Sequence, residues 1–477
     1  MRGGRRGATA AVFLVAFFVH YQSPVRQYGD SEYSLLLAEN LLRGGGFTLD
    51  RYFERPLDPG RYPGLRDDGL PYQVMEARGH VHYAFPPGSS LLSVPFVALA
   101  RLAGYSAIAP DGGYHAEGEH KIERRLAALL AAAVAAMAFL SARRLLAAEE
   151  APAGVRNRAR GLALVAALGL SFGSPAWSTA SRALWSHTWA LLLGMLAVHL
   201  LVRWRATGRP GPILLGTLLG SLLAWGFFTR PTGGLGLLGV AAWLALRARP
   251  LGGAGGDAAA GRALAAFAGA AGIWLALFAG WSLYHFGALV PPYFGLARLS
   301  LEDFGPALAG SLVSPSRGLL VFLPALLFVG VLALRHRRWL PFPDLALLGA
   351  GVGLAHLPVI ASFPHWWGGH SYGPRLATEA LPWFYLLAIV ALAGWSREAG
   401  RARSATRRRI EAGAGLALLA LSVALHAAGA LSRRTNLWNR HPVNVDTAPE
   451  RIWDWGDPQF LAWRRPRGPA APEAGEQ

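Results

Sequence analysis

The 477-residue chain contains no cysteine. This absence excludes disulfides, Cys-ligated zinc, iron-sulfur clusters and thiol catalysis. Charged residues are also scarce, at 16% of the chain, whereas hydrophobic residues make up 53%. The sequence has no P-loop and no soluble nucleotide-binding domain, so we do not expect it to use ATP or a nucleotide-linked donor in the cytoplasm.

The apolar residues come in repeated blocks of roughly 17 to 24 residues, long enough to cross a bilayer. The formal net charge of +18 would favour a nucleic-acid partner in a soluble protein. Here, however, the arginines lie mainly in short segments between the apolar blocks, and Lys121 is the one lysine. This distribution determines membrane topology instead, so no nucleic-acid partner is expected.

We therefore predict an all-α polytopic membrane protein with about eleven transmembrane helices and a long extracytoplasmic first loop. The first span follows Arg2, Arg5 and Arg6 and lacks a small-x-small cleavage site, which indicates a retained helix. The predicted spans are residues 8–22, 124–146, 161–180, 183–204, 213–229, 231–247, 262–286, 318–335, 344–362, 377–395 and 410–431.

Arginine clusters indicate which loops face the cytoplasm. Taking these clusters as cytoplasmic places residues 23–123 outside, the N-terminus inside, and a tail of residues 432–477 outside the cytoplasmic membrane of the cell. Residues 1–431 then form one transmembrane domain. The clusters are Arg143 to Arg160, Arg203 to Arg209, Arg247 to Arg262, Arg335 to Arg338 and Arg397 to Arg409.

Within the first loop, the apolar stretch 88–104 contains Pro95 and Arg101, which suits an interfacial or re-entrant helix better than a span. Residues 31–42 are predicted to form a short amphipathic helix that lies flat on the membrane, with Asp30 as its N-cap. Residues 50–79 are rich in Pro, Gly, Arg and Asp and are predicted to be irregular.

Two acidic residues, Asp30 and Glu32, immediately follow the first helix. A carboxylate held there could act as a general base toward an acceptor hydroxyl. The alternative is that Asp30 only caps a helix and Glu32 only favours its dipole. Spacing alone leaves both interpretations open.

His80 and His82 precede Tyr83 at alternate positions. Together with Asp30 the two histidines could hold a divalent cation. The alternative is a pair of solvated surface histidines. The metal requirement therefore stays open, and Tyr83 is a candidate substrate contact.

Three arginines lie at predicted outer ends of helices. Arg182 and His187 occupy a tight turn, Arg230 ends the fifth span, and Arg317 follows two serines at the start of another helix. A lipid phosphate is a natural partner for an arginine at this depth, and free N–H groups at a helix start favour an anion. The alternatives are snorkelling to the head groups and an ordinary capped helix.

The densest cluster of polar, glycine and aromatic residues runs from His365 to Arg375. Aromatic residues there could stack on a sugar or prenyl chain, and Arg375 could pair with phosphate. An aromatic belt is the alternative. The candidate substrate contacts in this segment are His365, Trp367, His370, Tyr372 and Arg375.

Together, these segments resemble the GT-C superfamily, and more narrowly bacterial proteins related to protein mannosyltransferases and lipid A aminoarabinose transferases. The resemblance lies in Asp30-Ser31-Glu32, the phrase 83–92, the Arg182 to His187 turn, Thr229-Arg230-Pro231, the segment 314–318 and the segment 366–375. It implies a sugar carried on a polyprenyl phosphate, an acceptor at the outer face, and an inverting single displacement. It also implies interfacial helices in the first loop and a catalytic acid that matches Asp30, with Glu32 second. Protein mannosyltransferases have adjacent acids, whereas Ser31 separates them here.

We therefore expect a hexosyl- or pentosyltransferase whose partners are a polyprenyl-phosphate-linked sugar, membrane lipid and a glycan, lipid or protein acceptor. The rival interpretation is a transporter or flippase of a lipid-linked or anionic solute. Transporters place polar groups near the midplane and often repeat internally, whereas the polar clusters here gather on one predicted face.

Overall fold

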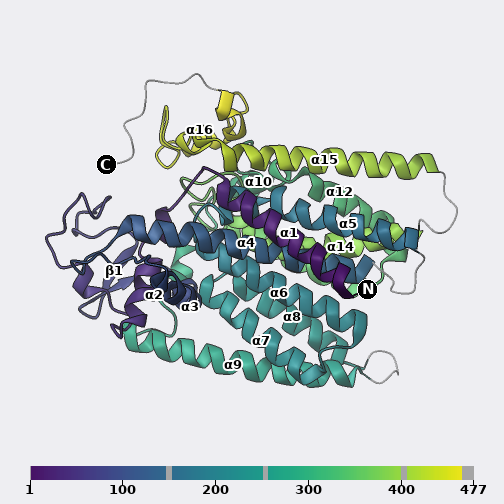
Figure 1. The fold of residues 1–477 in the computed structure, drawn as a ribbon, viewed down its shortest axis with the longest axis horizontal. Coiled ribbons are helices and arrows are strands. Elements are labelled where there is room, and N and C mark those ends of the chain that lie inside the picture. The colour runs from purple at the N-terminus through teal and green to yellow at the C-terminus, as the bar shows by residue number, and fades with distance from the viewer. Residues whose placement is uncertain (1, 147–152, 251–255, 399–404, 465–477) are drawn as a thin grey trace.

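The protein is described by a computed structural model that covers residues 2–146, 153–250, 256–398 and 405–464. Long helices run side by side along the longest axis of the molecule (Figure 1). The helices are α1 (Arg2–Gln22), α2 (Ser34–Leu42), α3 (Gly88–Leu102), α4 (Ala116–Leu146), α5 (Ala153–Phe172), α6 (Ser186–Thr207), α7 (Pro212–Thr229), α8 (Gly233–Ala248), α9 (Ala258–Phe286), α10 (Phe304–Val313), α11 (Leu319–Phe322), α12 (Pro324–Arg335), α13 (Pro343–Ala361), α14 (Leu381–Glu398), α15 (Ala405–Leu431) and α16 (Arg433–Leu437).

Within the described residues, 7 helical segments are long and apolar enough to cross a membrane: α4, α6, α7, α9, α13, α15, and α14 with the short helix before it. Shorter apolar helices, among them α3, α8 and α12, accompany them. The chain is thus a multi-pass membrane protein with a predominantly helical fold. Eleven as the number of spans stays a prediction.

Some predicted spans differ from the helices in their bounds. The α4 helix begins at Ala116, well before residue 124, where the predicted span starts. The predicted span 318–335 is divided between α11 and α12. The division falls at Pro324, whose ring removes a helical hydrogen-bond donor and clashes with the preceding turn.

The α4 helix forms the centre of the bundle and packs against α1, α5, α6 and α14. Its buried face is rich in alanine, including Ala127, Ala131, Ala135, Ala138 and Ala142. Small side chains let helix backbones approach one another closely inside a membrane. The sequence of α4 therefore favours a central position in the bundle.

The first loop contains a β-hairpin where an irregular segment is predicted. The strands β1 (Val74–Ala77) and β2 (His80–Tyr83) pair antiparallel, with Val74 opposite Tyr83. The turn between them uses positive φ angles, 52° at Arg78 and 78° at Gly79, as a two-residue hairpin turn requires. The prediction of an irregular segment is therefore wrong for residues 74–79.

The prediction that Asp30 caps α2 is also wrong. Asp30 lies in a separate short 3-10 helix, η1 (Gly29–Ser31), and Tyr33 then turns the chain with a φ of 68°. The free N–H groups at the start of α2 donate instead to the carboxylate of Glu119. The N···O distances are 3.0 Å from Tyr33, 2.7 Å from Leu35 and 3.2 Å from Leu36. A distant acid thus satisfies the helix start.

The α2 helix does not lie on a surface, because 7 of its 9 residues are buried. It packs on α3, the helix of the stretch 88–104. With 15 residues α3 spans about 22 Å, too short to cross the hydrocarbon core directly. An interfacial or re-entrant position for α3 stays a prediction.

The two ends of the bundle differ in composition. One end of the bundle holds the N-terminus of α1 and the arginine-bearing C-termini of α4, α8 and α14 (Figure 1). The first loop and α16 lie at the opposite end (Figure 1). At the arginine-rich end, Arg205 and Arg247 both pair with Asp344. The residues Arg401 and Arg403 of the last predicted cluster lie outside the described residues.

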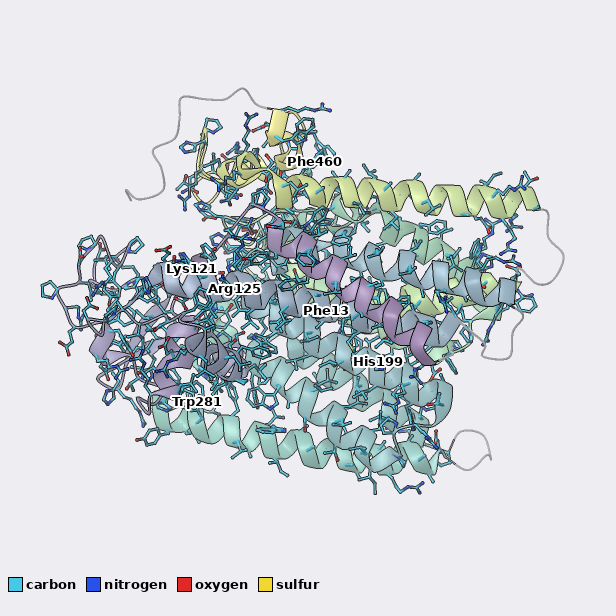
Figure 2. The ribbon with its side chains drawn as sticks, viewed as in Figure 1. Phe13, Lys121, Arg125, His199, Trp281 and Phe460 are labelled. Carbon is cyan, nitrogen blue, oxygen red and sulfur yellow. The ribbon has the colours of Figure 1, made fainter. Side chains whose placement is uncertain are left out.

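The C-terminal cap, defined as residues 432–464, covers part of the opposite end. It comprises α16, η8 (Pro449–Trp453) and η9 (Gln459–Arg464). Figure 2 shows Phe460 in this cap and Trp281 of α9 beside the first loop, where its ring lies 5.4 Å from that of Phe47. Residues 465–477 of the predicted tail lie outside the described residues.

Candidate active site

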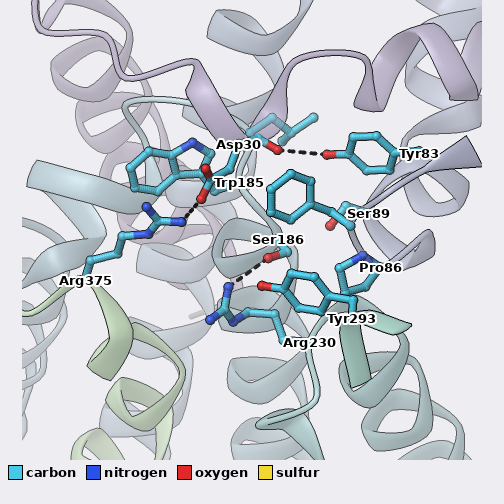
Figure 3. A pocket seen from close by; sticks show the side chains of 11 residues that line it. Asp30, Tyr83, Pro86, Ser89, Trp185, Ser186, Arg230, Tyr293 and Arg375 are labelled. Carbon is cyan, nitrogen blue, oxygen red and sulfur yellow. Dashed lines mark hydrogen bonds and ion pairs between the residues drawn. The ribbon is translucent and has the colours of Figure 1, made fainter. Parts of the chain in front are cut away.

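A cavity lies where the first loop meets the ends of several helices (Figure 3). About 300 Å³ of space lies between its walls, a figure that includes the open solvent at its entrance. Its walls come from η1, β2, the start of α3, the turn before α6, the end of α7 and the segment before α14. The lining residues are Asp30, Tyr83, Phe85, Pro86, Ser89, Leu184, Trp185, Ser186, Arg230, Tyr293 and Arg375.

Asp30 forms an ion pair with Arg375 at the edge of this cavity. The hydroxyl of Tyr72 donates to its Oδ1 at 3.1 Å, and the hydroxyl of Tyr83 donates to its backbone carbonyl at 2.9 Å. Burial acts to raise the pKa of Asp30, but the charge of Arg375 and the hydrogen bonds that Arg375 and Tyr72 donate to the carboxylate outweigh it and lower the pKa below its usual value. Asp30 is therefore an ionised carboxylate at neutral pH.

Arg375 is held on several sides. Its guanidinium lies 3.9 Å from the centre of the Trp185 ring, a cation-π contact. Its Nη1 donates to the carbonyl of Gly368 at 3.2 Å, and its Nε donates to Nε2 of His187 at 3.2 Å. The side chain is 12% exposed, so its charge acts in a partly desolvated setting.

Arg230 provides the second cation of the cavity. The α7 helix ends at Thr229 because Pro231 disfavours helical geometry at the residue before it, which places Arg230 at the mouth. Its Nε lies 3.1 Å from Oε1 of Glu379, and its Nη1 donates to the hydroxyl of Ser186 at 3.2 Å. A carboxylate thus neutralises this arginine too.

The charges of the cavity balance in its present state, because each arginine faces one carboxylate. An anionic group that enters can take over one or both guanidinium groups, which match phosphate geometry well. Tyr83, Tyr293 and Trp185 supply aromatic surface beside them. The arrangement suits a ligand that combines a phosphate with an apolar or sugar portion.

Glu32, the second predicted catalytic acid, does not line the cavity. Its Oε2 accepts a hydrogen bond from Gln73 at 3.1 Å. Burial and the nearby charge of Glu119 raise its pKa to about 7. Glu32 thus differs from Asp30 because it has no arginine partner in the described contacts. Its catalytic role stays a prediction.

Arg182 and Arg317, both predicted phosphate ligands, lie outside the cavity lining. Arg182 is 1% exposed and donates to the carbonyls of His20 and Ser23 at 2.7 and 3.1 Å. Arg317 is 2% exposed and donates to carbonyl and amide oxygens of five residues: Trp367, Ser316, Gly369, Gln459 and Asn439. These contacts join distant segments of the chain.

The predicted cluster 365–375 divides between three surroundings. Only Arg375 among its candidates lines the cavity. His365 and Trp367 hydrogen-bond to Oδ1 of Asp446 in the C-terminal cap, at 2.7 and 2.9 Å, and His370 lies 3.4 Å from Oδ2 of the same residue.

Tyr372, the remaining candidate of this cluster, is fully buried in the bundle. Its hydroxyl donates to the carbonyl of Leu425 at 2.6 Å.

The predicted metal set of Asp30, His80 and His82 is not formed. In the described part of the chain, no three His, Asp or Glu side chains are grouped so that they could hold a metal ion. His80 pairs with Asp50 at 2.9 Å, and the ring of His82 packs against His285 at 5.2 Å. The sequence spacing could not predict these partners, because both come from distant segments.

Several residues of the site were not among the sequence candidates, among them Tyr72, Trp185, Ser186, Tyr293 and Glu379. Glu379 closely follows the cluster 365–375, so its position gave a weak signal. Tyr72 lies in the segment predicted to be irregular, and nothing local in the sequence indicates its contact with Asp30.

No protein-family model and no curated protein matches the chain. Among solved structures, two of the Archaeoglobus fulgidus oligosaccharyltransferase match at 12% identity and a TM-score of 0.46. The match to the apo form covers 97% of this chain and 62% of that chain. The match to the form with a tethered acceptor peptide covers 93% of this chain and 58% of that chain. ArnT from Cupriavidus metallidurans, bound to undecaprenyl phosphate, matches at 15% identity and a TM-score of 0.46 over 97% of this chain and 76% of that chain. A likeness at this level adds nothing to the chemistry, which rests on the cavity residues themselves.

Proposed function

We propose that this protein is a membrane glycosyltransferase that moves a sugar from a polyprenyl phosphate to an acceptor hydroxyl. The observation that carries the proposal is the meeting of Asp30, Arg230 and Arg375 at one cavity with aromatic walls. The three residues come from remote parts of the chain, and an ionised carboxylate beside two guanidinium groups is what this reaction requires.

In the proposed step, the acceptor oxygen attacks the anomeric carbon of the donor sugar while its proton passes to Asp30. The bond between the anomeric carbon and the phosphate oxygen breaks, and its electron pair leaves with the polyprenyl phosphate. Arg230 and Arg375 stabilise the charge that develops on that phosphate. One displacement of this kind inverts the anomeric configuration.

The ion pair between Asp30 and Arg375 suggests an order of events. While Arg375 holds Asp30, the carboxylate is a weak base, because the neighbouring charge lowers its pKa. When the donor phosphate pairs with Arg375, Asp30 loses part of this stabilisation and its pKa rises. The base therefore becomes competent only when the donor is in place.

The arginine distribution supports an orientation with the cavity on the outer face of the cytoplasmic membrane, the N-terminus inside and the C-terminal cap outside. The acceptor is a hydroxyl of a glycan, lipid or protein that reaches this face. The donor enters from the membrane, since its polyprenyl chain is confined there.

The test is sugar transfer in membranes that contain the protein or its Asp30→Asn variant. Asparagine keeps the size of the side chain but cannot accept the proton, so transfer should fall by roughly 100-fold or more. Glu32→Gln is the matched control, since Glu32 lies outside the cavity. Undiminished transfer by Asp30→Asn would remove Asp30 from the mechanism, and loss in Glu32→Gln alone would transfer its role to Glu32. Mass spectrometry of copurifying lipids should show a polyprenyl-phosphate sugar and give the mass of the sugar.

A further inference from the structure

His187 and Glu379 form a bridge between the two arginines of the cavity. His187 is fully buried, and its Nδ1 is hydrogen-bonded to Oε1 of Glu379. The same Oε1 lies 3.1 Å from Nε of Arg230, and Nε2 of His187 accepts from Nε of Arg375 at 3.2 Å. A continuous chain of contacts therefore runs from Arg230 through Glu379 and His187 to Arg375 and Asp30.

The contacts fix the protonation of His187. Arg375 can only donate, so Nε2 of His187 must carry a lone pair. The ring hydrogen then resides on Nδ1 and is donated to Glu379. A doubly protonated ring would direct an N–H toward the guanidinium of Arg375, so the bridge is built for a neutral imidazole.

We propose that His187 is a positioning residue that holds Arg375 where it can bind the donor phosphate, and that Glu379 holds Arg230 and balances its charge until the phosphate arrives. The proposal rests on the function proposed above. His187 occupies the Nε edge of Arg375 and leaves the Nη2 atom to Asp30 or to an incoming phosphate. Glu379 holds Arg230 by its Nε and limits the positive charge of the empty cavity.

The two members of the bridge have opposite effects on phosphate affinity. Removing the His187 ring frees Arg375 to move and weakens the grip on phosphate. Replacing Glu379 by Gln removes the carboxylate that competes with phosphate for Arg230, so phosphate should bind more tightly and the product should leave more slowly. A pair that served only to hold the helices together would not produce opposite shifts.

A second buried His–Glu pair provides a matched control. His336 follows α12 and its Nδ1 is hydrogen-bonded to Glu398 at the end of α14. Unlike His187, His336 has an Nε2 without a hydrogen-bond partner among the described residues. The pair lies at the arginine-rich end of the bundle, away from the cavity (Figure 1). His336→Ala therefore reports what losing a buried His–Glu contact does to stability alone.

The experiment measures the dissociation constant of a polyprenyl monophosphate for the full-length protein in detergent, together with kcat and KM for transfer. We expect His187→Ala to bind about tenfold more weakly, Glu379→Gln to bind about tenfold more tightly with a lower kcat, and His336→Ala to bind as the wild type does. His187→Gln, which can still donate and accept, should restore part of the affinity. If Glu379→Gln does not fold, the two His187 variants decide.

Wild-type affinity in His187→Ala, or equal weakening in His187→Ala and His336→Ala, would overturn the positioning role. Those results would leave the proposed function intact, provided the wild type binds and transfers. If the wild-type protein does not bind the polyprenyl monophosphate, the proposed function and this inference both fail.

Discussion

Four arginines were candidates for phosphate binding, and the structure separates them into two pairs. Arg230 and Arg375 line the cavity and face carboxylates, Glu379 and Asp30. Arg182 and Arg317 instead donate mainly to oxygens of the protein backbone and of side-chain amides and hydroxyls. The first pair has ionic partners that an anion can replace, whereas the second is committed to the fold.

Burial therefore does not identify a ligand-binding arginine; the groups that the arginine pairs with do. A carboxylate and a phosphate compete for the same fork of N–H donors, so an arginine paired with an acid can exchange one for the other. If one of the second pair of arginines moved to a phosphate, the carbonyl to which it now donates would stay buried without a hydrogen bond, which costs about 1 to 3 kcal/mol. The second pair is therefore not free to exchange.

The largest expected effect is on stability. Arg317→Ala removes the donors of five acceptors at once, two of them on Gln459 and Asn439 of the C-terminal cap. We expect a loss of roughly 3 to 5 kcal/mol and release of the cap, because several buried oxygens lose their partners. Thermal unfolding in detergent and limited proteolysis within residues 432–464 measure this.

Two control variants accompany Arg317→Ala: a lysine at the same position, and the loss of an exposed arginine. Arg317→Lys should not restore stability, since one ammonium cannot reach all the acceptors. Arg61→Ala, which removes an exposed pair with Asp111, should leave the unfolding midpoint almost unchanged. A cap that stays resistant to protease in Arg317→Ala would contradict the structural role.

The next effect is on catalysis. In the proposed reaction both arginines stabilise the departing phosphate, so Arg375→Ala and Arg230→Ala should each lower sugar transfer by roughly 100-fold. Their unfolding midpoints should fall less than that of Arg317→Ala. Initial rates at saturating donor, with each variant's expression checked in the same membranes, provide the measurement. Near-normal rates in both variants would show that the cavity does not hold the phosphate.

The helical framework could be predicted because apolar blocks long enough to span a bilayer leave few alternatives. Features that depend on distant partners could not. Asp30 looked like the cap of α2, but Glu119, far along the chain, satisfies that helix start. The hairpin of β1 and β2 has only four residues in each strand, too short for a clear alternating pattern.

The candidate site was predicted in part. Asp30, Tyr83, Arg230 and Arg375 line one cavity, and His187 touches it through Arg375. Their residue types and their places at helix ends carried the signal. Nothing in the local sequence distinguishes Arg317 from Arg375, since both follow a polar segment that contains proline. Only the folded chain shows that Arg375 pairs with a carboxylate, whereas Arg317 donates to carbonyl and amide oxygens.

A smaller effect concerns the two acids that follow α1. Asp30 has an arginine partner, whereas burial and Glu119 raise the pKa of Glu32 from 4.5 to about 7. The folded state therefore keeps the Glu32 proton longer than the unfolded state, and the stability from burying the neutral acid is lost as the pH rises from 4.5 through about 7. Glu32→Gln should match the stability of the wild type near pH 4.5 and have a higher unfolding midpoint than the wild type at pH 8.

The measurement is the unfolding midpoint of the wild type and of Glu32→Gln across this pH range. Subtracting one from the other removes the contribution of the other acids and leaves the pH dependence that Glu32 causes. A difference that does not change with pH would mean that Glu32 titrates as in water. Such a result would also remove the contrast between Glu32 and its neighbour Asp30.

The smallest effect is expected at the edge of the C-terminal cap. Burial acts to raise the pKa of Asp446, but hydrogen bonds from His365 and Trp367 and the charges of His365 and His370 outweigh it and lower the pKa to about 2. The stability from this ionised group is present above its usual pKa of 3.8 and is lost as the pH falls toward 2. Asp446→Asn should cost less than about 1 kcal/mol at neutral pH, because partly exposed ion pairs contribute little.

The difference between Asp446→Asn and the wild type should therefore be smaller at pH 3 than at pH 7. Hydrogen exchange of residues 440–450 at both pH values measures it locally. A large loss at pH 7 would mean that this contact holds the cap as firmly as Arg317 does. The loop 365–370 would then depend on a single surface carboxylate. In the cap, an ionic contact would stabilise the fold as much as the hydrogen bonds of Arg317 do.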